Sequence, residues 1–267
     1  MTLLTGILVE MALLSAILIE PWYRMLYGPP RPGLACHDPN SVGLVVVLGG
    51  VGGLDTCGLG LRYVLGYLGT PYTVEVFRWG HGFGRWLVDL TDVANHEAKA
   101  QQLAALIRQF QREHPHEPVF MVAKSGGTGL AVKALEQLDP ESIEQVVLIA
   151  PALSPRYDLT PALRAVGGEI VVFWSPLDFI VLGIGTKLLG TIDRVRSVSA
   201  GLVRFVAPAR PPGRAIGLAP YDRLRQVKWR PSMATSGHLG GHVGPDSPRF
   251  LRKYVAPLLR PKDFRVH

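Results

Sequence analysis

Apolar and polar residues along the chain fall into two kinds of block, which predict strands and helices in turn. Almost wholly apolar runs predict buried strands at residues 44–48, 72–77, 119–122, 146–149 and 170–173, and a weaker, less apolar run predicts a sixth at 227–233. Helices are predicted at residues 95–114, 126–138 and 249–259, the first capped by Asp92 or Asn95 and stopped by Pro115. This alternation predicts an α/β domain with a mostly parallel sheet and helices on both faces.

The N-terminal segment has a different pattern. Residues 3–19 are almost wholly apolar, interrupted by Glu10, and no Lys or Arg precedes Arg24. A signal peptide needs a basic start, and 17 residues are at the short limit for a span that Glu10 would make costly. We expect residues 1–26 to form an apolar helix that lies on a membrane surface, on a second subunit or on its own domain. A spanning anchor is the alternative, with the domain on the cytoplasmic side. The expected location is cytoplasmic or membrane-associated.

Composition narrows the class of protein. The chain has 267 residues, 48% apolar and 18% charged, which fits one large domain over residues 27–267. The net charge is +7 and the basic excess lies in the last quarter. No nucleic-acid motif accompanies it, so a solvated surface is favoured and nucleic acid is not expected as a partner. Cys36 and Cys57 could pair, but two cysteines form neither a disulfide framework nor a metal signature.

Ser125 is the leading candidate for chemistry. It follows the apolar run 119–122, lies among the small residues Ala123, Gly126 and Gly127, and is followed at once by a helical pattern. This is the layout of a nucleophile elbow, a tight strand-to-helix turn that exposes a serine oxygen. Small residues are needed because the strained turn leaves no room for side chains on either side.

Two further residues complete a catalytic set at the carboxyl ends of predicted strands, where reactive groups collect in a parallel sheet. Asp178 follows the strand 170–173, and His242 follows the last strand, with His238 as the alternative base. The order Ser, acid, His is that of the α/β-hydrolase fold. A histidine takes the serine proton during attack, and the carboxylate orients the imidazole.

The oxyanion of a tetrahedral intermediate requires preorganised N–H donors. Gly126, directly after Ser125, is one candidate. The glycine-rich turn at residues 49–53 supplies the other, from Gly50 or Val51. The same turn lacks the third glycine of a dinucleotide fingerprint and has no Lys-Ser/Thr pair after it, so no cofactor is expected.

With these motifs, residues 43–260 resemble the α/β-hydrolases of the carboxylesterase and lipase group. Two positions depart from the family pattern: Ala123 replaces the usual first glycine of the elbow, and Lys124 replaces a frequent histidine. The ammonium of Lys124 is expected on the outer side of the sheet or facing an acidic substrate. The resemblance implies hydrolysis of apolar carboxylic esters of short to medium acyl length through an acyl-enzyme, without metal or cofactor.

Only residues 150–161 are available for a lid, so the site is expected to be open. The apolar stretch 179–185 is expected to line the acyl pocket or to belong to the core. An acyltransferase, a thioesterase and a catalytically silent binding protein on the same fold remain alternatives.

Overall fold

The computed structural model describes residues 41–53, 55–208 and 220–260. In this part of the chain six parallel strands form one sheet, in the order β2-β1-β3-β4-β5-β6. Their bounds are β1 (Leu44–Leu48), β2 (Thr73–Val76), β3 (Val119–Lys124), β4 (Gln145–Ile149), β5 (Ile170–Trp174) and β6 (Leu224–Lys228). The predicted helix over residues 1–26, the loop 209–219 and residues 261–267 lie outside the described residues.

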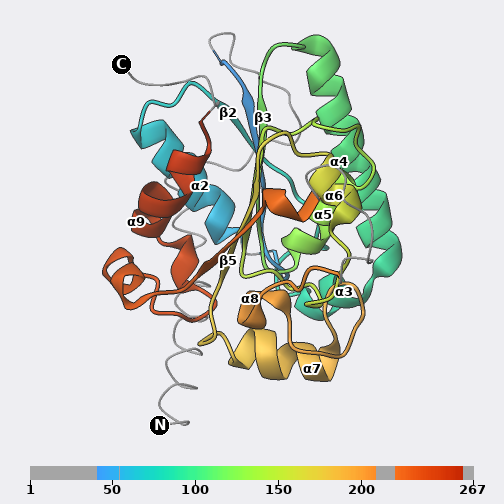
Figure 1. The fold of residues 1–267 in the computed structure, drawn as a ribbon, viewed down its shortest axis with the longest axis vertical. Helices are drawn as coiled ribbons and strands as arrows, with labels where there is room; N and C mark the ends of the chain where they lie inside the picture. The colour runs from blue at the N-terminus through green and yellow to red at the C-terminus, as the bar shows by residue number, and fades with distance from the viewer. Residues whose placement is uncertain (1–40, 54, 209–219, 261–267) are drawn as a thin grey trace, which may run out of the picture.

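Helices cover both faces of the sheet because the strands are apolar on both sides. Leu44, Val46 and Leu48 of β1 belong to one buried cluster, and Val45 and Val47 belong to the other. The first cluster includes residues of α4 (Val93–Glu113), α5 (Gly127–Leu135) and α6 (Thr160–Arg164). The second includes residues of α2 (Thr56–Tyr67), α9 (Pro248–Phe250), η5 (Leu251–Val255) and η6 (Ala256–Leu258). Figure 1 shows these two helical layers on opposite sides of the strands.

The first five predicted strands are confirmed to within a few residues, and Asp92 is the N-cap of α4, accepting from Asn95 N. The sixth strand was placed wrongly. It spans Leu224–Lys228, and residues Pro231–Ser236 form the 3-10 turn η3. Pro231 has no N–H to donate to a strand, and β6 lies at the sheet edge, where a continuous apolar run is not required.

The final helix is less regular than predicted. It comprises α9, the π-helical η5 and the 3-10 turn η6, so its pitch changes twice. Pro257 cannot donate to an α-helical ladder, which accounts for the change at η6. The thiol of Cys57 is buried and free, and Cys36 lies outside the described residues.

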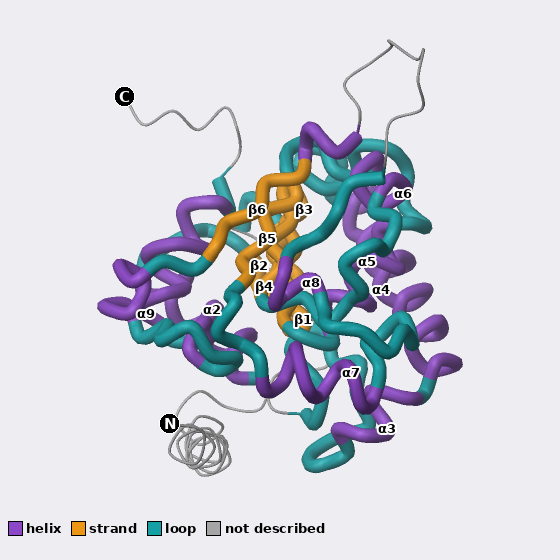
Figure 2. Tube along the Cα trace, turned by 60° about the horizontal axis from the view of Figure 1, so that its bottom comes forward, coloured by secondary structure: helices purple, strands orange, loops and turns teal. Residues whose placement is uncertain are grey.

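The carboxyl end of the sheet carries short helical elements instead of a large cap. They are α3 (Trp86–Thr91), η1 (Ile180–Gly185), α7 (Thr186–Leu189), α8 (Ala200–Val203) and η4 (Gly244–Asp246). Both views place α3 and α7 at this end (Figures 1 and 2). Residues 150–159 run directly from β4 to α6, which agrees with a minimal lid. At the amino side of β6 lies the turn η2 (Pro220–Arg223). No helix among the described residues is long and apolar enough to cross a membrane.

Candidate active site

Ser125 lies at a sharp turn between β3 and α5. Its φ of 52° is in the left-handed region, which costs a non-glycine residue on the order of 1–3 kcal/mol. Its N–H donates to Ile149 O at 3.0 Å, which ties the turn to the neighbouring strand. A methyl group on Gly127 would lie 2.3 Å from Gly49 O, so the start of α5 approaches the turn after β1 too closely for any side chain. The backbone therefore has the geometry of a nucleophile elbow.

Ser125, His242 and Asp178 form one hydrogen-bonded chain. His242 Nε2 lies 2.9 Å from Ser125 Oγ, and His242 Nδ1 lies 2.7 Å from Asp178 Oδ2. Asp178 is 3% exposed. Its carboxylate can only accept, so it favours the imidazole tautomer with the proton on Nδ1 and leaves Nε2 able to accept the serine proton. The loops after β5 and β6 thus bring an acid and an imidazole to the serine in the order needed for proton transfer.

His238, the alternative base, lies in apolar surroundings. Its ring packs against Phe250 and Trp229, with centroids 5.0 and 6.4 Å away. Its Nδ1 accepts a hydrogen bond from Gly240 N at 3.3 Å. Burial, reinforced by the nearby Lys124 charge, lowers the pKa of His238 to about 4. His242 therefore contacts both the serine and the aspartate, whereas His238 packs against aromatic side chains.

Two other acids, Asp158 after β4 and Asp193 after β5, have different contacts. Asp193 accepts from Ser154 N at 3.0 Å and from Ser154 Oγ at 2.5 Å. Asp158 Oδ1 accepts from Thr160 N at 2.9 Å. Both carboxylates thus accept hydrogen bonds from loop N–H groups, whereas Asp178 contacts the imidazole of His242.

The glycine turn after β1 packs against the nucleophile. A methyl group on Gly50 would lie 3.3 Å from Ser125 Cβ and 3.7 Å from its Oγ. A methyl group on Gly126 would lie 2.8 Å from Val51 Cγ1. Gly50, Val51 and Gly126, the three candidates for the oxyanion hole, thus lie together beside the serine.

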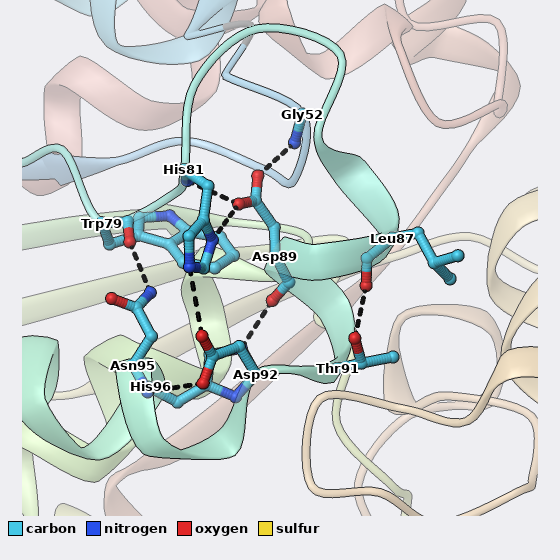
Figure 3. A network of polar contacts seen from close by, with 9 residues as sticks. All are labelled: Gly52, Trp79, His81, Leu87, Asp89, Thr91, Asp92, Asn95 and His96. Atoms are coloured by element: carbon cyan, nitrogen blue, oxygen red, sulfur yellow. Dashed lines mark hydrogen bonds and ion pairs between the residues drawn. The ribbon is translucent and has the colours of Figure 1, made fainter.

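A buried carboxylate that sequence reasoning missed holds this turn. Asp89 of α3 is 0% exposed and accepts from Gly52 N at 2.7 Å, from His81 N at 2.6 Å and from His81 Nδ1 at 2.9 Å (Figure 3). On its other side, Trp79 Nε1 donates to Gly49 O at 2.9 Å. Asp89 lies in an otherwise apolar stretch, and a single polar residue there was the available signal.

The surroundings of Lys124, the residue directly before Ser125, differ from those expected. Lys124 is 7% exposed and forms an ion pair with Asp246, so its ammonium points neither to the outer side of the sheet nor to a substrate. Asp246 Oδ2 also accepts from Thr56 Oγ1 at 2.5 Å. Asp246 follows His242 by four residues, and the ion pair therefore links the elbow strand to the histidine loop.

No group of His, Cys, Asp and Glu among the described residues has the arrangement of a metal site.

Comparison with known proteins places these features in context. The family model described as serine aminopeptidase, S33, matches residues 74–179, a range that includes Ser125 and Asp178 but neither the glycine turn nor His242. No curated protein matches the sequence.

Similar solved structures include three proteins of low identity. Trichoderma reesei cutinase in complex with a phosphonate inhibitor is 16% identical (TM-score 0.43, 71% of this chain, 87% of that one). The esterase PE8 is 17% identical (TM-score 0.43, 86% and 98%). The protein TT1662 from Thermus thermophilus is 15% identical (TM-score 0.45, 80% and 86%).

The parallel sheet with helices on both faces and the strained serine turn define an α/β-hydrolase fold, as the resemblance predicted. Together with the family match, this supports a hydrolase.

Proposed function

We propose that this protein is a serine hydrolase that cleaves carboxylic esters with short to medium acyl chains. The observation that carries the proposal is the continuous hydrogen-bonded chain Ser125–His242–Asp178 at a strained elbow. A buried carboxylate, an imidazole and a serine at a strained turn, hydrogen-bonded in this order, are the groups that acyl transfer requires.

In the first half-reaction Ser125 Oγ attacks the ester carbonyl carbon while its proton passes to His242 Nε2. The carbonyl oxygen becomes an oxyanion, which N–H groups of Gly126 and of Gly50 or Val51 stabilise. Collapse expels the alcohol, which takes the proton from His242 and leaves an acyl-serine. In the second half-reaction water gives a proton to His242, its oxygen attacks the acyl carbon, and the acid departs as Ser125 regains the proton. Asp178 stays ionised and stabilises the imidazolium in both steps.

Labelling with a fluorophosphonate probe tests the nucleophile and the base. Wild type should be labelled, and Ser125→Ala should lose labelling completely. His242→Ala should slow it by at least about a thousandfold, a typical scale for loss of a triad member. The matched control is His238→Gln, four residues away in the same loop, which should retain labelling. Absence of labelling in folded wild type would refute the nucleophile and favour a silent binding protein.

A substrate panel separates the remaining alternatives. p-Nitrophenyl esters of increasing acyl length, an acyl-thioester, an aminoacyl anilide and an ester with added alcohol acceptor would be compared by kcat/KM. We expect the highest values on the short and medium esters. The anilide is included because the matched family is described as an aminopeptidase. Preference for the thioester, the anilide or alcohol transfer would replace the ester proposal while leaving the triad intact.

A further inference from the structure

Large apolar side chains are exposed on the short helical elements and loops at the carboxyl end of the sheet, the end that carries Ser125. We call the following six the apolar rim: Phe83, Trp86, Leu87, Ile184, Leu188 and Leu239. The last three are 55%, 68% and 74% exposed. Single exposed apolar residues are common on soluble proteins, but a group of them beside one site marks an interaction surface.

Hydrogen bonds and close packing join the parts of the rim into one surface. Arg194 Nη1 donates to Leu90 O of α3 at 3.4 Å and to Leu189 O of α7 at 3.2 Å. α3 and η1–α7 are therefore bridged, and they lie near each other at the same end of the molecule in both views (Figures 1 and 2). On the other side, the loop carrying Leu239 meets Leu177, because a methyl group on Gly240 would lie 2.6 Å from Leu177 Cδ1.

Each part of the rim either contacts a residue of the site or lies close to one along the chain. Trp86 packs over Gly52 of the glycine turn, with its Cβ 3.3 Å from where a methyl group on Gly52 would lie. Asp178 directly precedes the segment that leads into η1, and Leu239 precedes His242 by three residues. The rim therefore contacts the glycine turn and lies close along the chain to Asp178 and His242.

The charges near the rim have one dominant sign. Arg85, Lys187 and Arg196 are exposed. Within residues 80–92 and 179–196 the three acids are Asp89, which is fully buried, Asp92, which contacts His81 and caps α4, and Asp193, which is hydrogen-bonded to Ser154. An apolar centre with exposed cations around it complements an anionic lipid surface, where cations meet the headgroups and apolar side chains enter the boundary region.

We propose that the apolar rim docks this domain on the surface of an anionic lipid bilayer, with Ser125 facing the lipid. A second copy of the chain or another protein on the same surface would cover the mouth of the site. A bilayer leaves the mouth open to acyl esters within it. Docking goes beyond the proposed function, because it uses none of the three residues of the hydrogen-bonded chain.

Vesicle sedimentation tests the docking in the full-length Ser125→Ala protein, whose binding is independent of turnover. The probes are vesicles of phosphatidylcholine alone and of phosphatidylcholine with phosphatidylglycerol. We expect stronger binding to the anionic vesicles. Leu188→Glu/Leu239→Glu should lower the partition coefficient at least about tenfold, since each leucine contributes a partly buried apolar side chain. The control Leu68→Glu, exposed at the end of α2 away from the rim, should bind as the parent does.

A second matched pair of variants tests whether positive charge near the rim contributes to vesicle binding. Arg196→Glu should weaken binding to anionic vesicles about fivefold or more and leave binding to phosphatidylcholine unchanged. Arg112→Glu, an exposed arginine in the last turn of α4, should have no effect. Residues 1–40 are present in every variant, so binding through them cannot separate the pairs.

Equal binding of the rim variant and its control would overturn the proposal, as would self-association of the parent that the rim variant abolishes in the absence of lipid. The proposed ester hydrolysis fails separately. When Ser125 is kept, the Leu188→Glu/Leu239→Glu variant should hydrolyse a soluble short-chain ester at the wild-type rate. Its rate should fall only on esters held in anionic vesicles. No hydrolysis of any ester by wild type would refute the function and leave the binding result standing.

Discussion

Replacing Asp89 with asparagine tests whether the glycine turn depends on this buried carboxylate for its geometry. The carboxylate accepts three N–H groups, one from Gly52 and two from His81. An asparagine side chain has one acceptor oxygen and an NH₂ group that only donates. One orientation satisfies Gly52 and turns a donor toward His81, and the other does the reverse. At least one N–H therefore loses its acceptor in a fully buried position.

The magnitude follows from these contacts. A hydrogen bond to a charged group contributes about 1.5–3 kcal/mol, so the free energy of unfolding should fall by about 2 kcal/mol. If Gly52 shifts, the neighbouring Gly50 and Val51 shift with it. Complete loss of one oxyanion donor lowers kcat about 10²–10³-fold, which sets the upper limit. A displaced but still present donor should lower kcat about tenfold to a hundredfold. KM should change less than about threefold, because the donor acts mainly in the transition state.

The assay is steady-state hydrolysis of a soluble short-chain ester, with urea unfolding of the same samples. Asp92→Asn is the control, because the Asp92 side chain also contacts His81, at 3.1 Å through Nε2, but its other hydrogen bond is to Asn95 N and not to the glycine turn. Asparagine can still cap α4 there, so kcat should stay within about twofold. Destabilised Asp89→Asn protein with wild-type kcat at a temperature where it is folded would refute the role of Asp89 in positioning the turn.

Three further changes test other parts of the site. Lys124→Met leaves Asp246 as an unpaired buried carboxylate and should destabilise the fold by about 3–5 kcal/mol in urea unfolding, whereas adding Asp246→Leu should recover part of the loss. The pKa of His238, lowered to about 4 mainly by burial, means that stability is fully present above the unfolded-state pKa of about 6.5 and is lost as pH falls toward 4. His238→Gln should remove up to about 3 kcal/mol of that loss, and an unchanged pH–stability curve would contradict it. Gly50→Ala places a methyl group 3.7 Å from Ser125 Oγ and should slow ester hydrolysis at least about tenfold without lowering stability by more than about 1 kcal/mol, measured side by side.

The strands and the elbow could be predicted because their signals are local. Residues 44–48 and 119–122 are apolar throughout, since both faces of the sheet are covered. Ser125 is flanked by small residues because the close approach of Gly127 to Gly49 O requires them. In both cases the physical constraint acts on neighbouring residues, and a single stretch of sequence records it.

The helix α2 was missed because it contains glycines, which lower helix propensity and are required by close packing against residues distant in the sequence. A methyl group on Gly60 would lie 2.9 Å from Leu251 Cδ1 and 3.0 Å from Asp246 O. Glycine lowers local helix propensity, but here it allows α2 to pack closely on η5. Asp89 was missed for a similar reason, since its partner Gly52 is 37 positions earlier.

The choice between His242 and His238 depends on the same kind of long-range contact. Both lie in one glycine-rich loop, and the sequence favours neither decisively. The ion pair of Asp246 with Lys124, the residue directly before Ser125, ties this loop to β3. A lysine at this buried position needs a carboxylate partner, and the partner lies four residues after His242. One ion pair thus neutralises the buried lysine and sets the distance between the proposed nucleophile and its base. Substituting Lys124 by histidine would therefore disturb the His242 loop unless Asp246 changed with it.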